Sequence, residues 1–99
     1  MDEEFELPKI GDILVEEFLE PLKITPYRLA KDLGVSTSSI LDLVHNKRKI
    51  SVEMALRLSK YFGTSSKLWL NMQNELDLRE TKEKLENDLE KIPRCRQIA

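Results

Sequence analysis

Apolar residues recur every three or four positions along this 99-residue chain, and no long segment alternates apolar and polar residues as a strand does. The pattern predicts an all-α protein. The first helix is expected from about Gly11 to Glu20, because Pro21 lacks an N–H and disfavours helix in the residue before it. Its apolar face comprises Ile13, Leu14, Val15, Phe18 and Leu19.

The next two helices are short, and the residues at their ends define them. Thr25 can cap the second helix with Pro26 as its first residue, and Gly34 suits the left-handed position that ends it. Ser36 can cap the third helix, which we expect to end near Asn46, a residue that tolerates left-handed backbone. A turn of about four residues, 33–36, joins the two.

Two further helices follow, each with a serine that can act as its cap. Ser51 begins the fourth, which Gly63 ends, and Ser65 begins the fifth. The residues expected to point inward are Met54, Leu58, Tyr61 and Phe62 in the fourth helix and Leu68, Trp69, Met72 and Leu76 in the fifth. Trp69 and Met72 could line a ligand pocket, but their spacing with Leu76 favours core positions.

The character of the chain changes after Leu78. Residues 79–91 are dominated by charge, with a thin apolar stripe at Leu85, Leu89 and Ile92. This segment is either a continuation of the fifth helix or a separate helix, and its stripe is too narrow to fold alone. We therefore expect an acidic tail over residues 1–9, a helical domain over 10–79 and a charged helical extension and tail over 80–99.

The segment from Thr25 to Lys49 carries the pattern of a helix-turn-helix. Ala30 is small enough to let the third helix lie steeply against the second, and Gly34 permits the tight turn. Val35 fills the corner between the helices, while Ile40 and Leu43 anchor the third helix to the core.

Charge is segregated along the chain, although its net value is only −2. Residues 1–20 hold eight acids and one base, a net charge of −7, whereas residues 23–49 hold six bases and two acids, a net charge of +4. DNA responds to the field within about 8–10 Å, not to the total charge of the chain. The central segment can therefore face phosphate despite the acidic total.

Burial of the apolar stripe on the third helix leaves a polar face outward. The residues expected to read base edges are Ser36, Thr37, Ser38 and Asp42. The residues expected to contact phosphate are Arg28 and Lys31 on the second helix and Asn46, Lys47, Arg48 and Lys49 after the third.

At three segments the sequence resembles the HigA-type antitoxins of the lambda-repressor-like helix-turn-helix superfamily. They are PKIGDILVEEFLEPLKIT, YRLAKDLGVSTSSILDLVHNKRKIS and ALRLSKYFGTSSKLWLNMQNELDLR, in which FGTSSKLWLNMQ is the most specific run. The resemblance implies a five-helix, lambda-repressor-like fold, usually dimeric. It also implies repression of the chain's own operon at a palindromic operator, and neutralisation of a RelE-like mRNA-cleaving toxin.

Two positions depart from the family pattern. Members commonly carry Gln where this chain has Pro26, so the phosphate interaction of that Gln is absent or moved. A Gly is common where Lys47 stands, so the turn must place its left-handed residue at Asn46 or distort.

The sequence gives no reason to expect an enzyme. It holds no nucleophile paired with a base, no phosphate-cradling glycine loop and no set of metal-ligand residues, so we expect neither a metal nor a cofactor. We expect His45 to lie at a helix end and Cys95, the only cysteine, to be a free thiol. No membrane-spanning run or signal peptide is evident, which favours a cytoplasmic location.

Three functions remain open at this point. The chain could be an antitoxin and autorepressor, a stand-alone transcription regulator of the same fold, or a helical module used only for protein contacts. The acidic residues 1–9 could be a solvated tail or could contact a basic toxin. The stripe at Leu85, Leu89 and Ile92 could pack within the chain, between two copies or against a toxin.

Overall fold

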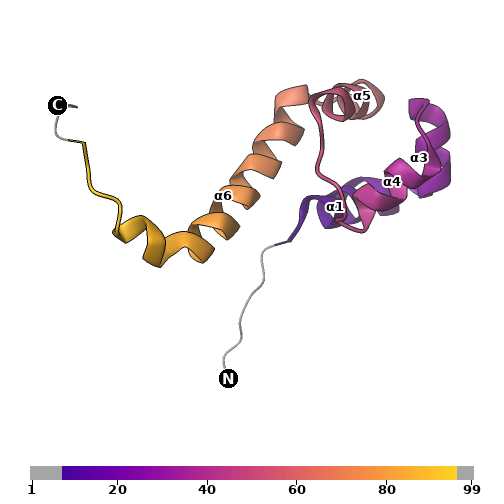
Figure 1. Cartoon of the computed structure of the whole chain (residues 1–99). Helices are drawn as coiled ribbons and strands as arrows, with labels where there is room; N and C mark the ends of the chain where they lie inside the picture. The colour runs from indigo at the N-terminus through magenta and orange to yellow at the C-terminus, as the bar shows by residue number, and fades with distance from the viewer. Residues whose placement is uncertain (1–7, 96–99) are drawn as a thin grey trace.

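The computed structural model describes residues 8–95. A first helical unit runs without a break through α1 (Ile10–Ile13), a π-helical stretch η1 (Leu14–Leu19) and α2 (Glu20–Leu22). It is followed by α3 (Pro26–Leu33), α4 (Thr37–Val44), α5 (Val52–Phe62) and α6 (Ser66–Glu90). With the first unit counted as one helix, the described chain has five helices and no strand, which confirms the predicted fold (Figure 1).

The predicted helix caps are all present. The hydroxyls of Thr25, Ser36, Ser51 and Ser65 each accept a hydrogen bond, at 3.1 Å, from the backbone N–H three residues later. Gly34 and Gly63 end α3 and α5 with φ of 74° and 75°, values that cost an L side chain energy. Each of these helix ends depends on residues within a few positions along the chain, so the local sequence predicts it.

The predicted end of the first helix at Glu20 is wrong by two residues. Helical backbone continues through Pro21 to Leu22, and the chain turns away at Lys23 with φ of 57°. The helix already has π-type hydrogen bonding before the proline, because the N–H of Glu20 donates to the carbonyl of Val15, five residues earlier, rather than to that of Glu16. The wider turn gives the proline ring room that an α-helix interior would deny it.

The core lies between the first helical unit and helices α3 to α6. Its fully buried large side chains are Leu14, Leu29, Ile40, Leu43, Leu58 and Trp69. The ring of Trp69 packs against Phe18 and Phe62, with centroid distances of 4.8 and 6.2 Å. Trp69 is thus a core residue, as predicted.

Leu68 departs from the predicted inward face and stays 37% exposed. One residue is about 100° of helical rotation, so Leu68 lies well to the side of the face centred on Trp69. The buried position that the apolar pattern missed is Gln73, which is 7% exposed. Its amide accepts from the N–H of Ile50 at 2.6 Å and donates to the carbonyl of Ile50 at 2.8 Å, which ties the loop before α5 to α6.

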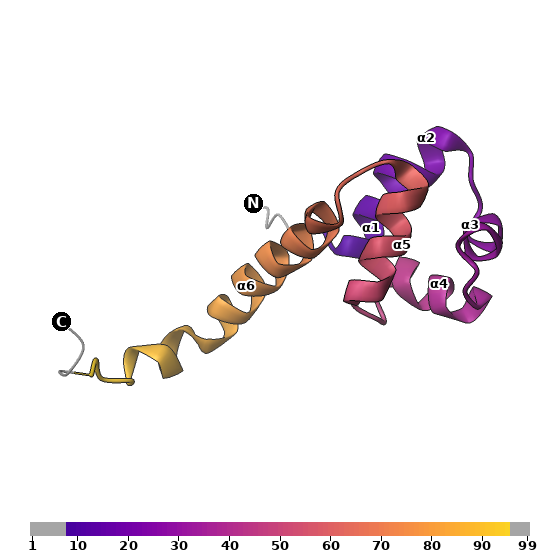
Figure 2. The same cartoon turned by 90° about the horizontal axis from the view of Figure 1, so that it is seen from above.

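Helix α6 resolves the alternative left open for the charged segment, because it continues without a break to Glu90. It extends away from the other helices in both views (Figures 1 and 2). Every described residue from Leu78 onward is exposed, including Leu85 and Leu89. The expected boundary between residues 79 and 80 therefore falls inside a continuous helix, at the point where its side chains leave the core.

Candidate nucleic-acid interface

Helices α3 and α4 lie side by side at the end of the molecule away from the distal part of α6 (Figures 1 and 2). Ala30 of α3 is 1% exposed and Ile40 of α4 is fully buried, so both helices contribute to the core. Arg57 of α5 donates to the carbonyl of Leu33 at 2.7 Å and so satisfies the end of α3. This hydrogen bond links α5 to the turn between α3 and α4.

The beginning of α4 presents hydroxyl groups at the surface. Ser38 is exposed and Thr37 is half-buried. Ser36 differs from both, because its hydroxyl caps the helix and also lies 2.7 Å from the Ser39 hydroxyl and 3.3 Å from that of Ser38. Of the three hydroxyls predicted to read bases, only that of Ser36 accepts the capping hydrogen bond, so those of Thr37 and Ser38 are freer to bind another group.

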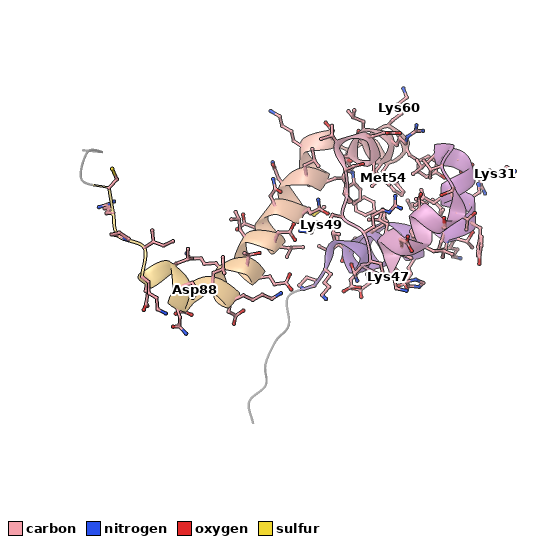
Figure 3. All side chains as sticks on the ribbon, in the orientation of Figure 1. Lys31, Lys47, Lys49, Met54, Lys60 and Asp88 are labelled. Carbon is pink, nitrogen blue, oxygen red and sulfur yellow. The ribbon has the colours of Figure 1, made fainter. Side chains whose placement is uncertain are left out.

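Cationic side chains lie beyond both ends of α4. Figure 3 shows Lys31 on α3 and Lys47 after α4 near opposite ends of α4. Arg48 is half-exposed, and its guanidinium lies 3.9 Å from the carboxylate of Asp42, itself 45% exposed. Lys49 faces another way, since its ammonium pairs with Asp77 of α6 at 3.1 Å.

The side chain of Asn46 has a structural role that sequence reasoning missed. Its carbonyl oxygen accepts from the N–H of Gly11 at 2.8 Å, and its amide donates to Asp12 at 3.1 Å. These bonds fasten the end of α4 to the first turn of α1 across 34 and 35 residues of sequence. The amide was predicted to contact phosphate, and its two hydrogen bonds to α1 leave one of its N–H groups for such a contact.

A second polar cluster joins α3 to α5. One carboxylate oxygen of Asp32 accepts from the Tyr61 hydroxyl at 2.6 Å and from Nε of Arg28 at 2.9 Å. The hydrogen bond from Tyr61 holds the pKa of Asp32 below its usual value, and the same bond raises the pKa of Tyr61. Sequence spacing could suggest the Arg28–Asp32 pair but not its partner on another helix.

Other candidate chemistry is sparse. His45 is exposed at the end of α4, as its predicted helix-end role requires, and Cys95 is an exposed free thiol. Among residues 8–95, no cluster of three or more His, Cys, Asp or Glu side chains could hold a metal ion. Within the same range no helix is both long and apolar enough to cross a bilayer.

Comparison with known proteins agrees with this geometry. Residues 15–69 match the helix-turn-helix family. Virulence-associated protein I of Dichelobacter nodosus is 46% identical over 75% of this chain and 70% of its own length. The transcriptional regulator YbaQ of Escherichia coli is 40% identical over 90% of this chain and 78% of its own length.

A solved structure adds a comparison of the fold to these comparisons of sequence. The antitoxin HigA of Pseudomonas aeruginosa, determined with the higBA promoter, superimposes with a TM-score of 0.84. It is 36% identical, and the match covers 89% of this chain and 97% of that one. This chain is a helix-turn-helix protein of the HigA type.

The two departures from the HigA pattern now have a structural description. Pro26 occupies the first position of α3 behind the Thr25 cap, so it offers no polar side chain there. The left-handed residue of the turn is Asn46, with φ of 61°, and the N–H of Lys47 donates to the carbonyl of Asp42 at 2.8 Å. In this HigA-type chain the turn therefore accommodates a lysine without left-handed strain at that lysine.

Proposed function

We propose that this chain binds a palindromic operator in its own promoter as a homodimer and represses transcription. The observation that carries the proposal is the surface of α4, where Ser38 and Thr37 lie at the exposed N-terminal end and cations flank the helix. Short hydroxyl side chains can approach base edges closely, and flanking cations can bind the phosphates on either side. The similarity to a HigA determined with its promoter supports the same use of this surface.

The proposed contacts divide into two groups. Thr37, Ser38 and Asp42 would read bases in the major groove, with Ser36 shaping that end of the helix as its cap. The proposed phosphate contacts are Arg28, Lys31, Asn46, Lys47, Arg48 and Lys49. Of these, Lys49 would first have to leave Asp77, and Asn46 would use the N–H that it does not donate to Asp12. Phosphate contacts supply salt-dependent affinity, while base contacts supply sequence preference.

The test measures affinity for the promoter and for random DNA at several salt concentrations. Replacing Lys47 and Arg48 by alanine should weaken binding to both DNAs and lower the salt slope by about 0.9 for each phosphate that is no longer neutralised. Replacing Thr37 or Ser38 by alanine should instead change the preference between sequences. Lys82 on the exposed part of α6 and Lys91, which follows its last residue Glu90, provide the matched control, a removal of two charges outside α3 and α4.

Two outcomes would contradict the proposal. Wild-type protein that shows no preference for its promoter over random DNA at moderate salt would rule out autorepression. A salt slope left unchanged by the Lys47 and Arg48 substitutions would show that this turn does not contact phosphate.

We also propose that the chain neutralises a RelE-like toxin encoded beside it, as its HigA-type family membership suggests. Co-expression with the product of the neighbouring reading frame, followed by pull-down, tests this partner. Whether residues 1–9 form a solvated tail or contact a toxin lies largely outside the described residues, since the structure begins at Pro8.

The alternative is a stand-alone regulator without a toxin, and the match to YbaQ, a transcriptional regulator by name, favours it. Operator binding together with no interaction between the chain and the neighbouring gene product would select this alternative.

A further inference from the structure

Electrostatics disfavours a carboxylate at the position of Asp32 for two reasons. It lies in the last turn of α3, where the carbonyl end of the helix carries partial negative charge. It also lies on the helix that, under the proposed function, would cross the phosphate backbone of DNA. A carboxylate there should weaken DNA binding unless it performs a task that outweighs repulsion.

The ion pair of Asp32 with Arg28 is unlike the other helical pairs of the described chain. In Glu53–Arg57, Glu75–Arg79 and Glu80–Lys84 the acid precedes the base by four residues, the favourable order for a helix. In Arg28–Asp32 the base comes first, which is the less favourable order. The Arg28–Asp32 pair should therefore stabilise its helix less than each of the other three pairs stabilises its own.

The contacts of Asp32 fix its carboxylate from the core side. The Tyr61 hydroxyl donates to it at 2.6 Å, and the half-buried Tyr61 ring packs edge-on against Phe62 at a centroid distance of 5.0 Å. The Asp32 side chain is only 26% exposed, whereas that of Arg28 is 66% exposed. A connected path thus leads from the aromatic core through Asp32 to a guanidinium at the surface.

The Arg28 guanidinium is engaged at only one of its three nitrogens. Asp32 engages only Nε of Arg28, so the two terminal nitrogens have no partner among the hydrogen bonds of the described residues. That outer edge carries two parallel N–H groups, the arrangement that binds two phosphate oxygens at once. A side chain already held in one orientation loses less rotamer freedom when it binds.

We infer that Asp32 is a positioning residue, which Tyr61 anchors and which aims the Arg28 guanidinium at a phosphate of the operator. The inference rests on the proposed function. Its consequence is unusual, because removing a negative charge from a DNA-binding surface should then weaken binding to DNA.

The experiment is a double-mutant cycle measured by fluorescence anisotropy on the promoter and on random DNA. Asp32→Ala should weaken promoter binding about fivefold, the effect expected of about one ordinary net hydrogen bond, and Arg28→Ala should do the same. In the Arg28→Ala background, Asp32→Ala should cause no further weakening, since the residue it positions is absent. Tyr61→Phe keeps the ring and the net charge, and should reproduce part of the Asp32 effect.

Glu75→Ala is the matched control. It removes the same charge and breaks an ion pair of the same spacing on α6, and should leave the affinity within about twofold. Thermal unfolding of every variant shows whether it is folded at the assay temperature.

The outcomes separate the inference from the proposed function. Tighter binding of Asp32→Ala to both DNAs would mean that the carboxylate only repels phosphate, and additive effects for Arg28 and Asp32 would mean that they act independently. Either result overturns the positioning role while operator binding stands. Wild-type protein without promoter preference would overturn the proposed function and the positioning role with it.

Discussion

Tyr61 is the residue at which the aromatic core reaches the surface of the helix-turn-helix. Its ring contacts Phe62, and its hydroxyl donates to Asp32 on a different helix. Because the bond favours the protonated phenol and the ionised carboxylate, it raises the pKa of Tyr61 and lowers that of Asp32.

These shifts set the pH range in which the hydrogen bond stabilises the fold. The contribution of Tyr61 is present below its unfolded pKa of about 10 and is lost as pH rises through the higher folded value. The contribution of Asp32 is present above its unfolded pKa of about 3.9 and is lost as pH falls through the lower folded value. Between about pH 4 and pH 10 the hydrogen bond should therefore remain intact.

The tyrosinate absorbance measures this directly. The chain has two tyrosines, so Tyr27→Phe leaves Tyr61 as the only titrating phenol. We expect its midpoint above the usual value of about 10, and a return toward that value when Asp32→Asn is added. Equal midpoints in the presence and absence of the Asp32 carboxylate would contradict the assignment.

Gln73 provides a second single-residue prediction. Its amide serves both the N–H and the carbonyl of Ile50 in the core, so Gln73→Leu would leave two buried polar groups without partners. We expect a loss of about 2–3 kcal/mol in the free energy of unfolding, measured by urea denaturation. Asn74→Leu, at the exposed neighbouring position, should change stability by no more than about 0.5 kcal/mol.

The sequence predicts some of these residues and misses others for a physical reason. Thr25 and Gly34 act on backbone within a few positions, so local patterns predict their roles. Asn46 and Gln73 act on Gly11 and Ile50, which lie 35 and 23 residues away. Nothing in the local sequence specifies such partners, so the sequence does not predict the hydrogen bonds of Asn46 to α1 or those of Gln73 to Ile50.

Whole helices show the same division between local and tertiary causes. The pattern predicts all five helices but places the end of the first at Glu20. The proline rule describes a regular α-helix, whereas a π-helical stretch, Leu14–Leu19, comes shortly before Pro21. The pattern also leaves residues 79–91 undecided, since a narrow apolar stripe fits both a continuation of α6 and a separate helix.

The packing of α1 against α4 determines how the proposed reading helix is held. A Cβ at Gly11 would collide with the carbonyl oxygen of Leu43 and lie 2.5 Å from the side-chain oxygen of Asn46. Gly11→Ala should therefore destabilise the fold by about 1–3 kcal/mol, despite the intrinsic preference of helices for alanine. Gly63→Ala is the comparison, because a Cβ there would meet no atom within 4 Å beyond the adjacent backbone, and only its φ of 75° opposes the side chain.

Unfolding by urea distinguishes the two effects. Gly63→Ala should cost about 1 kcal/mol from backbone strain, less than Gly11→Ala. If Gly11→Ala is the milder change, α1 and α4 can separate at little cost and do not hold each other in place.

The molecule as a whole consists of a packed body and a projecting helix. The predicted site lies on the body at α3 and α4, while the exposed distal part of α6 points away from it (Figure 3). Lys49 of the body pairs with Asp77 of α6, and Gln73 of α6 is hydrogen-bonded to Ile50 of the body. Both α6 residues precede residue 80. The body should therefore not depend on the rest of α6.

Truncation after Arg79 tests this separation and the predicted domain boundary together. Because every described side chain beyond that point is exposed, the shortened chain should retain cooperative unfolding with a midpoint within a few degrees of the full chain. Its helical circular dichroism should fall only by the share of the residues removed. The comparison is made at a dilution at which sedimentation shows both chains to be monomers, since association would add stability that depends on concentration. A large drop in the midpoint under those conditions would mean that residues 80–99 belong to the folding unit and that the boundary is misplaced.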